Sequence, residues 1–360
     1  MARADRFERL RSRRIPLEKI AAAKLESFYR ATADQDFSYL VDAMSPIDAQ
    51  FTENTFAEGE RVRNQLEKNF SPEFKAEFEF QGSVTIDTHI RIHSDIDLLS
   101  LHGGFHTLDS GVQPSNLYPH QQSLEDLVSM RAEAARILKE KFPEVSVGAL
   151  PGKSITLEGG SLRRKIDVVI GNWWNTEQWK QYKVKMARGV RILDSKVPTT
   201  IKNKPFWHNY EINKKDEETG TLRKVIRLLK TLKYDSEPEL KISSYDIAAI
   251  AWNMKSDALK VRENAYMPLA KNALAELKRF IENDVVRNGL SVPNGMRKVF
   301  GGDGATLDSL KALYRELDEL ITRIEVGRLI SFSKSASLLT ESRLPTWQER
   351  RPQVVQRYSF

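Results

Sequence analysis

Two carboxylates, Asp95 and Asp97, stand two residues apart in the segment 81–99 (QGSVTIDTHIRIHSDIDLL), and Ile96 and Leu98 alternate with them. Alternate residues of a strand point to the same face, so this spacing predicts that both acids face one way while Ile96 and Leu98 face the core. Two like charges held so close need a positive charge between them. Mg²⁺ suits this place because it binds carboxylate oxygens together with substrate phosphates. The pair therefore predicts two Mg²⁺ ions, replaceable by Mn²⁺, that clamp a phosphoryl transfer.

Gly82 and Ser83 precede the two acids by the length of a short strand. A glycine lets backbone amides come close to phosphate oxygens, and a serine hydroxyl adds one more donor. A Gly-Ser pair alone is usually a turn, and an Asp-x-Asp pair alone is usually a solvated edge. Together they indicate a site that binds phosphate beside metal ions.

A third carboxylate, Asp167, lies in the apolar run 165–170, where an unpaired charge would be costly. Asp167 could simply cap the start of its strand, but its apolar flanks are better explained if it joins Asp95 and Asp97 at the metal. We therefore assign all three acids as metal-binding and catalytic. The expected reaction is attack of a ribose hydroxyl on an α-phosphate, with pyrophosphate leaving.

The elements that must position these residues form an α/β half followed by a helical half. Apolar periodicity predicts helices over 46–70 and from Ser123 to Pro143, strands over 78–100, and a hairpin over 153–171 that turns at Gly159-Gly160. The Gly-, Pro- and Ser-rich stretch 101–122 predicts a long loop. Further helices are expected over 222–233, 244–254, 268–286 and 306–326. The expected fold is α+β, with a catalytic lobe over 1–200 that carries a long N-terminal helix, a helical lobe over 201–342 and a tail over 343–360.

The order Gly-Ser, Asp-x-Asp and a third Asp on a later strand resembles the DNA polymerase β-type nucleotidyltransferase superfamily. QGSVTIDTHIRIHSDIDL is similar to the bacterial cGAS/DncV-like nucleotidyltransferases, and NYEINKKDEETGTLRKVIRLLKTLK with ISSYDIAAIAWNM is similar to their second lobe. The resemblance spans roughly residues 79–254. It implies a nucleotidyltransferase palm with a mixed sheet and flanking helices, and a second lobe like that of oligoadenylate synthase. It also implies synthesis of a cyclic di- or trinucleotide messenger in antiphage, CBASS-type signalling, with a downstream effector and regulatory proteins as partners.

Three basic residues of the second lobe, Arg223, Arg227 and Lys230, fall within about 60° of one another on a helix, opposite an apolar stripe. Such a basic stripe is usually a solvated face. The resemblance instead implies that Lys230 binds the triphosphate, that Ser244 contacts phosphate and that Tyr245 stacks on the base.

A helix N-terminus is predicted independently by the pair Ser243 and Asp246. The free amides and the macrodipole at such an end favour anions. This local signal agrees with a phosphate contact near Ser244.

A zinc site is a weaker alternative, suggested by four histidines: His89, His93, His102 and His106. Four-residue spacing suits a helix rather than a strand, and the last two histidines fall in the expected loop.

Bulk composition limits the remaining functions. The chain of 360 residues has no cysteine, which excludes disulfides and cysteine-based metal centres. Its net charge of +7 suits a polyanion, but 56 basic and 49 acidic residues are interleaved, so NTP substrates are expected and stable nucleic-acid binding is not. Without an apolar run of about 20 residues or a secretory signal, a cytoplasmic protein without membrane contact is expected.

Two other functions stay open on the sequence alone. One is a template-free transferase that modifies RNA or a small molecule, and the other is a catalytically silent nucleotide- or RNA-binding module. Base choice, linkage, ring size, activating signal, oligomeric state and effector identity have no signature in these residues.

Overall fold

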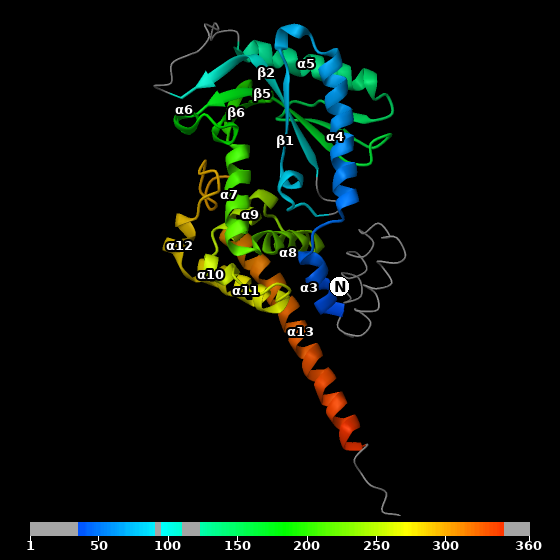
Figure 1. The fold of residues 1–360 in the computed structure, drawn as a ribbon, viewed down its shortest axis with the longest axis vertical. Coiled ribbons are helices and arrows are strands. Elements are labelled where there is room, and N and C mark those ends of the chain that lie inside the picture. Colours follow the sequence, from blue (N-terminus) through cyan, green and yellow to red (C-terminus); the bar gives the residue numbers. More distant parts are fainter. Residues whose placement is uncertain (1–34, 91–94, 110–122, 342–360) are drawn as a thin grey trace, which may run out of the picture.

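The structure is a computed structural model that describes residues 35–90, 95–109 and 123–341, with side chains described up to residue 327. The expected tail over 343–360 lies outside the described residues, as does most of the expected loop over 101–122. Within the described part, a mixed β-sheet with flanking helices is followed by a helical half, which confirms the α+β prediction (Figure 1).

Seven strands form one sheet in the described residues, and the central strands run in the order β1-β2-β5-β4-β3. The parallel pair β2 and β5 lies at its centre, and the other pairs are antiparallel, including β6 with β5 and β7 with β6. The strand bounds are β1 Glu77–Gln81, β2 Ile96–Leu108, β3 Ser146–Gly148, β4 Ile155–Glu158, β5 Ile166–Asn175, β6 Gly189–Asp194 and β7 Thr199–Asn203.

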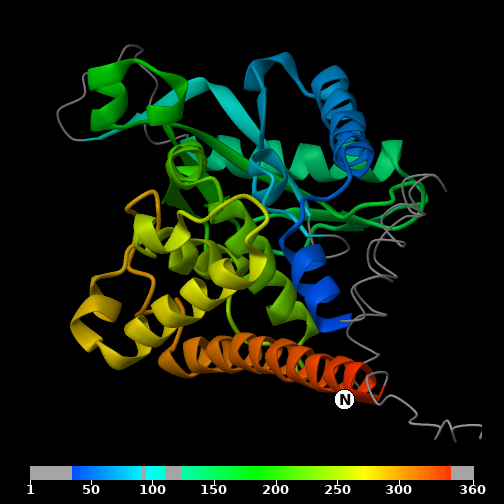
Figure 2. The same ribbon diagram turned by 60° about the horizontal axis from the view of Figure 1, so that its bottom comes forward.

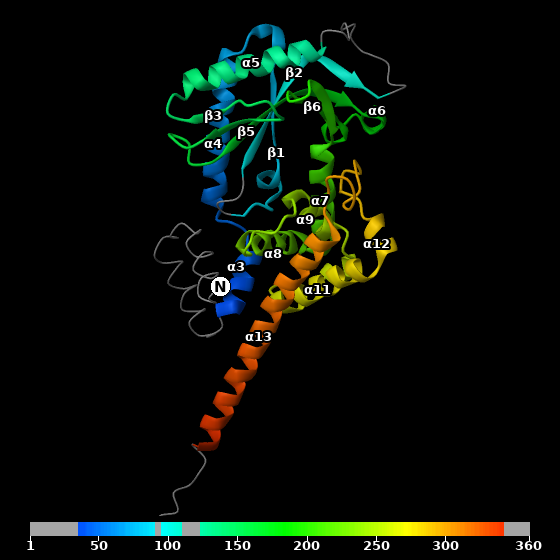
Figure 3. The same ribbon diagram turned by 180° about the vertical axis from the view of Figure 1, so that it is seen from behind.

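Two long helices, α4 (Ala49–Asn69) and α5 (Ser123–Lys141), pack against the sheet (Figure 3). Their apolar sides contact the sheet residues Ile96 and Leu98, which are fully buried. The predicted inward direction of these two side chains is therefore confirmed, and with it the outward direction of the acids that alternate with them. The predicted hairpin is also confirmed, as β4 and β5 with a positive φ at the two turn glycines.

The predicted loop is wrong over its first part, because β2 continues to Leu108. A side chain at Gly103 would place its Cβ 2.3 Å from the carbonyl oxygen of Lys75, so the glycine marks a close approach of two backbones. The register of β2 against β5 shifts between His102 and His106. Glycine in this segment therefore belongs to an irregular strand rather than to a loop.

The helical half begins after β7 with α7, which runs from the sheet toward the other helices (Figure 1). Helices are present in all four predicted ranges, but the range 268–286 is divided at Asn283 between α11 and α12. Helix α13 lies beside α11 and projects away from the sheet (Figures 2 and 3). The bounds are α7 Pro205–Thr219, α8 Leu222–Asp235, α9 Ser244–Trp252, α10 Ser256–Leu259, α11 Tyr266–Glu282, α12 Asp284–Gly289 and α13 Leu307–Glu341.

An earlier helix, α3 (Gln35–Met44), packs into this same helical core through Leu40 and Met44. The division of the chain near residue 200 remains a proposal. The sheet extends to Asn203, and α3 contributes to the core on the other side of that division.

Shorter elements complete the description: α6 Glu177–Tyr182 and the 3₁₀ turns η1 Pro72–Phe74, η2 Ser83–Ile86 and η3 Lys185–Ala187. None of the described helices is both long and apolar enough to span a bilayer.

Candidate active site

A cavity of about 330 Å³ lies where the sheet half meets the helical half. Pockets for small-molecule ligands usually fall between roughly 300 and 1,000 Å³, so this one can take a nucleotide. Seven of the eight residues predicted for the site line it, and they come from both halves of the chain: Gly82, Ser83, Asp95, Asp97, Lys230, Ser244 and Tyr245. The fold therefore collects in one place residues that are separated by more than 160 positions in the sequence.

The eighth residue, Asp167, lies beside Asp97 on the neighbouring strand. The two are register partners in the parallel pair β2–β5, and Gln81 of β1 pairs with Asp97 from the other side. Neighbouring strands lie about 4.8 Å apart, so the two carboxylates share one end of the sheet. The Thr156 hydroxyl donates to Asp167 Oδ1 at 2.5 Å. The third predicted acid, Asp95, comes directly before the first residue of β2.

The carboxyl group of Asp97 has an altered proton affinity. Burial, together with the negative charges of Asp167 and Asp95, raises its pKa to about 7, although the positive charge of Lys165 acts in the opposite direction. A buried carboxyl group with two further acids beside it needs positive charge nearby before it can ionise. Oxygen-only ligands with this repulsion fit hard divalent cations such as Mg²⁺.

A positive charge does lie among the acids, and it belongs to Lys165, which the sequence analysis missed. Its Nζ donates to Asp95 Oδ2 at 2.6 Å and to Asp167 Oδ2 at 3.0 Å. The corner between these two oxygens therefore accommodates a cation. Within the described residues, no three acidic or histidine side chains lie close enough together to form a metal-binding group. A signal for Lys165 existed, because it precedes Asp167 by two residues and alternation places both on one face.

Gly82 is required by the position of Asp97. Its φ of +88° lies in the region that side chains rarely adopt, and a Cβ there would lie 2.5 Å from Asp97 Oδ2. The following 3₁₀ turn η2 is closed by the Thr85 hydroxyl, which donates to the Gly82 carbonyl oxygen at 2.7 Å. Asn209 of α7 donates to that same hydroxyl at 2.9 Å. The Gly82-Ser83 segment is thus held from both halves of the chain.

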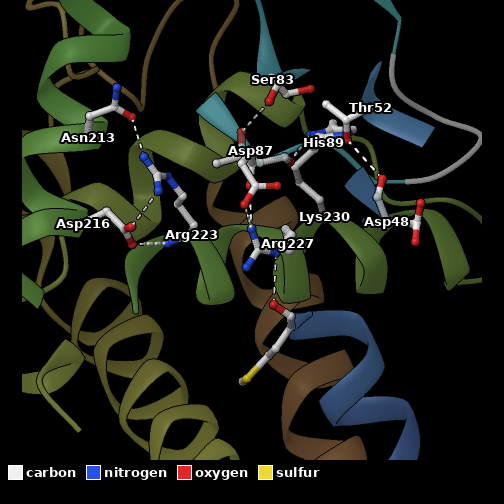
Figure 4. A network of polar contacts seen from close by, with 12 residues as sticks. Asp48, Thr52, Ser83, Asp87, His89, Asn213, Asp216, Arg223, Arg227 and Lys230 are labelled. Carbon is white, nitrogen blue, oxygen red and sulfur yellow. Dashed lines mark hydrogen bonds and ion pairs between the residues drawn. The ribbon is translucent and has the colours of Figure 1, made fainter. Parts of the chain in front are cut away.

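Lys230 is almost completely buried, with 2% of its surface exposed, and its Nζ donates to the carbonyl oxygen of Thr88 at 2.8 Å (Figure 4). Burial, together with the positive charges of Lys233 and Arg227, lowers the pKa of its amine to about 7. Lys230 lines the cavity with Ser83. The charged form of such a buried amine is strongly stabilised when an anion binds beside it.

Arg227, one turn before Lys230 on α8, joins the helical half to the segment that follows Ser83 (Figure 4). Its guanidinium donates to the Met44 carbonyl oxygen at 3.0 Å and to Asp87, through the carbonyl at 2.5 Å and the carboxylate at 3.1 Å. The usual interpretation of a basic stripe as a solvated face is wrong for these two residues. They form a buried contact between the halves.

The predicted helix start at Ser243 is confirmed. Its hydroxyl accepts from the Asp246 amide at 2.9 Å and caps α9. The next two residues, Ser244 and Tyr245, line the cavity, and the Tyr245 ring stacks on His208 of α7 with ring centroids 4.6 Å apart. Burial lowers the pKa of His208 to about 4 and keeps the ring neutral. No sequence motif indicated His208, because only packing between α7 and α9 brings it here.

The zinc alternative is not supported in the part of the chain that the structure describes, where no histidine belongs to a metal-holding group. His89 Nε2 lies 2.9 Å from the Thr52 hydroxyl, and the His102 ring packs against Phe74 and Phe105. His93 lies outside the described residues.

Comparison with known proteins identifies the family of the chain. Residues 210–322 match the family described as the cGAS/DncV-like nucleotidyltransferase C-terminal helical domain. A cyclic dinucleotide synthase, CdnE, from Yersinia aleksiciae is 35% identical over 303 residues, which are 82% of this chain and 78% of that protein. A c-di-GMP synthase from Capnocytophaga granulosa is 30% identical over 348 residues, which are 89% of this chain and 97% of that protein.

A solved structure extends the agreement to the fold. The STING-associated CdnE c-di-GMP synthase from Capnocytophaga granulosa is similar to this chain with a TM-score of 0.73 and 25% identity, over 90% of this chain and 98% of that one. The likeness in sequence and in fold covers both the sheet half and the helical half. The chain belongs to the bacterial cGAS/DncV-like nucleotidyltransferases.

Proposed function

We propose that this enzyme condenses two nucleoside triphosphates into a cyclic dinucleotide and releases pyrophosphate. The observation that carries the proposal is the one cavity that Asp95 and Asp97, the Gly82-Ser83 turn and Lys230 line together. A phosphoryl transfer needs these three components: carboxylates for cations, donors for phosphate oxygens and a buried positive charge. The similarity to synthases of cyclic dinucleotides supports the choice of product class.

The acids are proposed to bind two Mg²⁺ ions, or Mn²⁺ in their place. Asp95 and Asp97 would hold both ions, and Asp167 would complete the site near the acceptor hydroxyl. When bound, the ions neutralise phosphate charge and lower the pKa of the attacking ribose hydroxyl. The sheet contributes rigidity, because paired strands fix the acids relative to one another.

The phosphates are proposed to lie against Gly82, Ser83 and Lys230. The Ser83 hydroxyl and the amides of η2 donate hydrogen bonds, and the Lys230 ammonium supplies charge in a water-poor cavity where it counts most. Ser244, at the first turn of α9, adds a donor at a helix N-terminus, where anions are favoured. Tyr245 offers a ring for base stacking, backed by His208.

Guanine is the first base to test, because proteins similar to this chain are c-di-GMP synthases. We propose that the product is a second messenger in CBASS-type antiphage signalling and is bound by a separate effector protein. The condensation reaction proposed above does not depend on which base is used or on which effector binds the product.

The test is incubation of the protein with all four NTPs and Mg²⁺ or Mn²⁺, followed by mass spectrometry of the products and an assay for pyrophosphate. A cyclic dinucleotide accompanied by pyrophosphate is the expected result. Omitting one NTP at a time then identifies the bases.

Two outcomes would contradict the proposal. Nucleotide transfer to added RNA in excess of condensation between free NTPs would favour a template-free RNA transferase. NTP affinity without pyrophosphate release under either cation would favour a binding module. The Asp97→Asn variant serves as the control for contaminating activity.

A further inference from the structure

The ammonium group of Lys165 forms ion pairs with two of the three proposed catalytic acids. It lies 2.6 Å from Asp95 Oδ2 and 3.0 Å from Asp167 Oδ2, and thus connects an acid at the start of β2 with an acid on β5. Both oxygens belong to acids that the proposed function assigns to metal binding. A cation can therefore use them only by sharing them with the ammonium or by displacing it.

Displacement is sterically open. The Lys165 side chain is 36% exposed, whereas the Asp167 side chain is 15% exposed. The lysine can leave toward solvent while the acids stay fixed by the strands. A flexible ammonium on a four-carbon stem exchanges partners more readily than a carboxylate that accepts from Thr156 on the neighbouring strand.

Charge balance gives the ammonium a function when the acids hold no ion. Three carboxylates at one end of the sheet repel one another, and without a counter-charge this repulsion destabilises the folded chain. Lys165 supplies one positive charge to this cluster from within the chain. The same charge opposes the approach of a divalent cation.

We propose that Lys165 is a built-in counter-cation that stabilises the metal-free carboxylates and competes with the divalent ion for Asp95 and Asp167. The inference rests on the proposed function for the identity of the metal ligands. It assigns Lys165 as a positioning residue that sets how tightly the ion is held before any nucleotide is bound. Metal loading is therefore weaker in this chain than three acids alone would give.

The test is a titration of the full-length protein with Mn²⁺ in the absence of nucleotide, in which electron paramagnetic resonance measures the free ion. Lys165→Met should lower the dissociation constant for Mn²⁺ by about 10-fold or more, because one opposing charge is removed beside a divalent ion. Lys278→Met is the matched control, since it removes the same charge from an exposed pair with Glu282 on α11. Its dissociation constant should equal that of the unmodified protein.

Thermal unfolding supplies a second readout. Metal-free Lys165→Met should have a lower Tm than the unmodified protein. Saturating Mn²⁺ should raise the Tm of this variant by more than it raises the Tm of the unmodified protein. If this variant does not fold without metal, Lys165→Gln keeps an amide donor for one carboxylate and should show the same gain in Mn²⁺ affinity.

An unchanged or weaker Mn²⁺ affinity in folded Lys165→Met or Lys165→Gln would overturn the proposal. Because the titration contains no nucleotide, its result is independent of the product that the enzyme makes. A gain in Mn²⁺ affinity in the Lys165 variants, combined with no cyclic dinucleotide from the unmodified protein, would overturn the proposed function. The proposed role of Lys165 would still hold.

Discussion

Asp97 and Asp167 are register partners on two parallel strands, and the negative charge of Asp167 helps to raise the pKa of Asp97. Their separation is set by the spacing of the strands and not by their own flexible bonds. The sheet therefore holds the two carboxylates close together before any cation binds. Such preorganisation is what a phosphoryl-transfer site requires, because its catalysis is mainly positioning and charge neutralisation.

Asp97→Asn is expected to abolish pyrophosphate release, with a rate loss above about 1,000-fold, or about 4 kcal/mol of barrier. The amide has the shape of the acid but cannot supply its charge to a cation. Folding should be unharmed, because the substitution removes repulsion from Asp167 and Asp95. Pyrophosphate release and the Tm of the metal-free protein measure the two effects. Glu158→Gln, an exposed acid at the end of β4, is the control and should keep full activity.

Gly82→Ala is expected to lower both stability and NTP affinity, because its Cβ would collide with Asp97 Oδ2. Gly159 is a matched control: its φ is +76°, and a Cβ there would meet nothing within 4 Å. Gly159→Ala should therefore lose only about 1–2 kcal/mol of unfolding free energy through backbone strain. Chemical unfolding and equilibrium NTP binding separate the two contributions. Equal NTP affinities in the two variants would contradict the proposed role of Gly82.

Lys230→Met is expected to weaken NTP binding by about 10- to 100-fold, the loss of a hydrogen bond that carries charge. Equilibrium binding with a non-hydrolysable NTP analogue measures this loss. Lys224→Met, on the same helix α8, is the control and should bind the analogue normally. Binding at the wild-type level in Lys230→Met would remove this residue from the phosphate site.

The stability of the chain should depend on pH through the same lysine. The pKa of Lys230 is about 7 in the folded chain and 10.5 in its ordinary state. Between these values the unfolded chain binds a proton that the folded chain does not, so stability rises with pH. Below pH 7 both states are protonated, and the full penalty of the buried charge applies. Urea unfolding at about pH 7 and about pH 9.5 measures the effect. The unfolding free energy of the unmodified protein should increase relative to that of Lys230→Met at the higher pH. A difference between the two proteins that is constant with pH would contradict the low pKa.

Arg227→Met is expected to destabilise the chain by about 2–3 kcal/mol, because it removes the donor to the buried Met44 carbonyl group and to the partly buried Asp87 carbonyl group. Arg223 is a control from the same helix, since its partners Asp216 and Asn213 both lie on α7 within the helical half. Arg223→Met should cost less than about 1 kcal/mol, as expected for a partly exposed pair. Chemical unfolding of the two variants measures the difference, and equal losses would contradict a contact between the halves at Arg227.

The sequence predicted those features of the site that depend on neighbouring residues. Strand alternation gave the common direction of Asp95 and Asp97, and the cap at Ser243 followed from the residue three positions later. Gly82 was identified from the Gly-Ser pair that precedes the two acids, and its positive φ is a conformation that glycine adopts readily. The roles of all these residues in catalysis remain predictions. The resemblance added Lys230, Ser244 and Tyr245, and the structure places them in the same cavity.

Only the tertiary structure decided which distant residues meet. The glycines of β2 predicted a loop, because a close approach to the backbone of Lys75 leaves no trace in local periodicity. The burial of Arg227 depends on Asp87 and Met44, which are 140 and 183 positions away. Lys165 acquires its place between two acids from the parallel pairing of β2 with β5, which joins segments about 70 residues apart. Local patterns fix the direction of a side chain, whereas its partner, its charge state and its burial depend on contacts between distant segments of the chain.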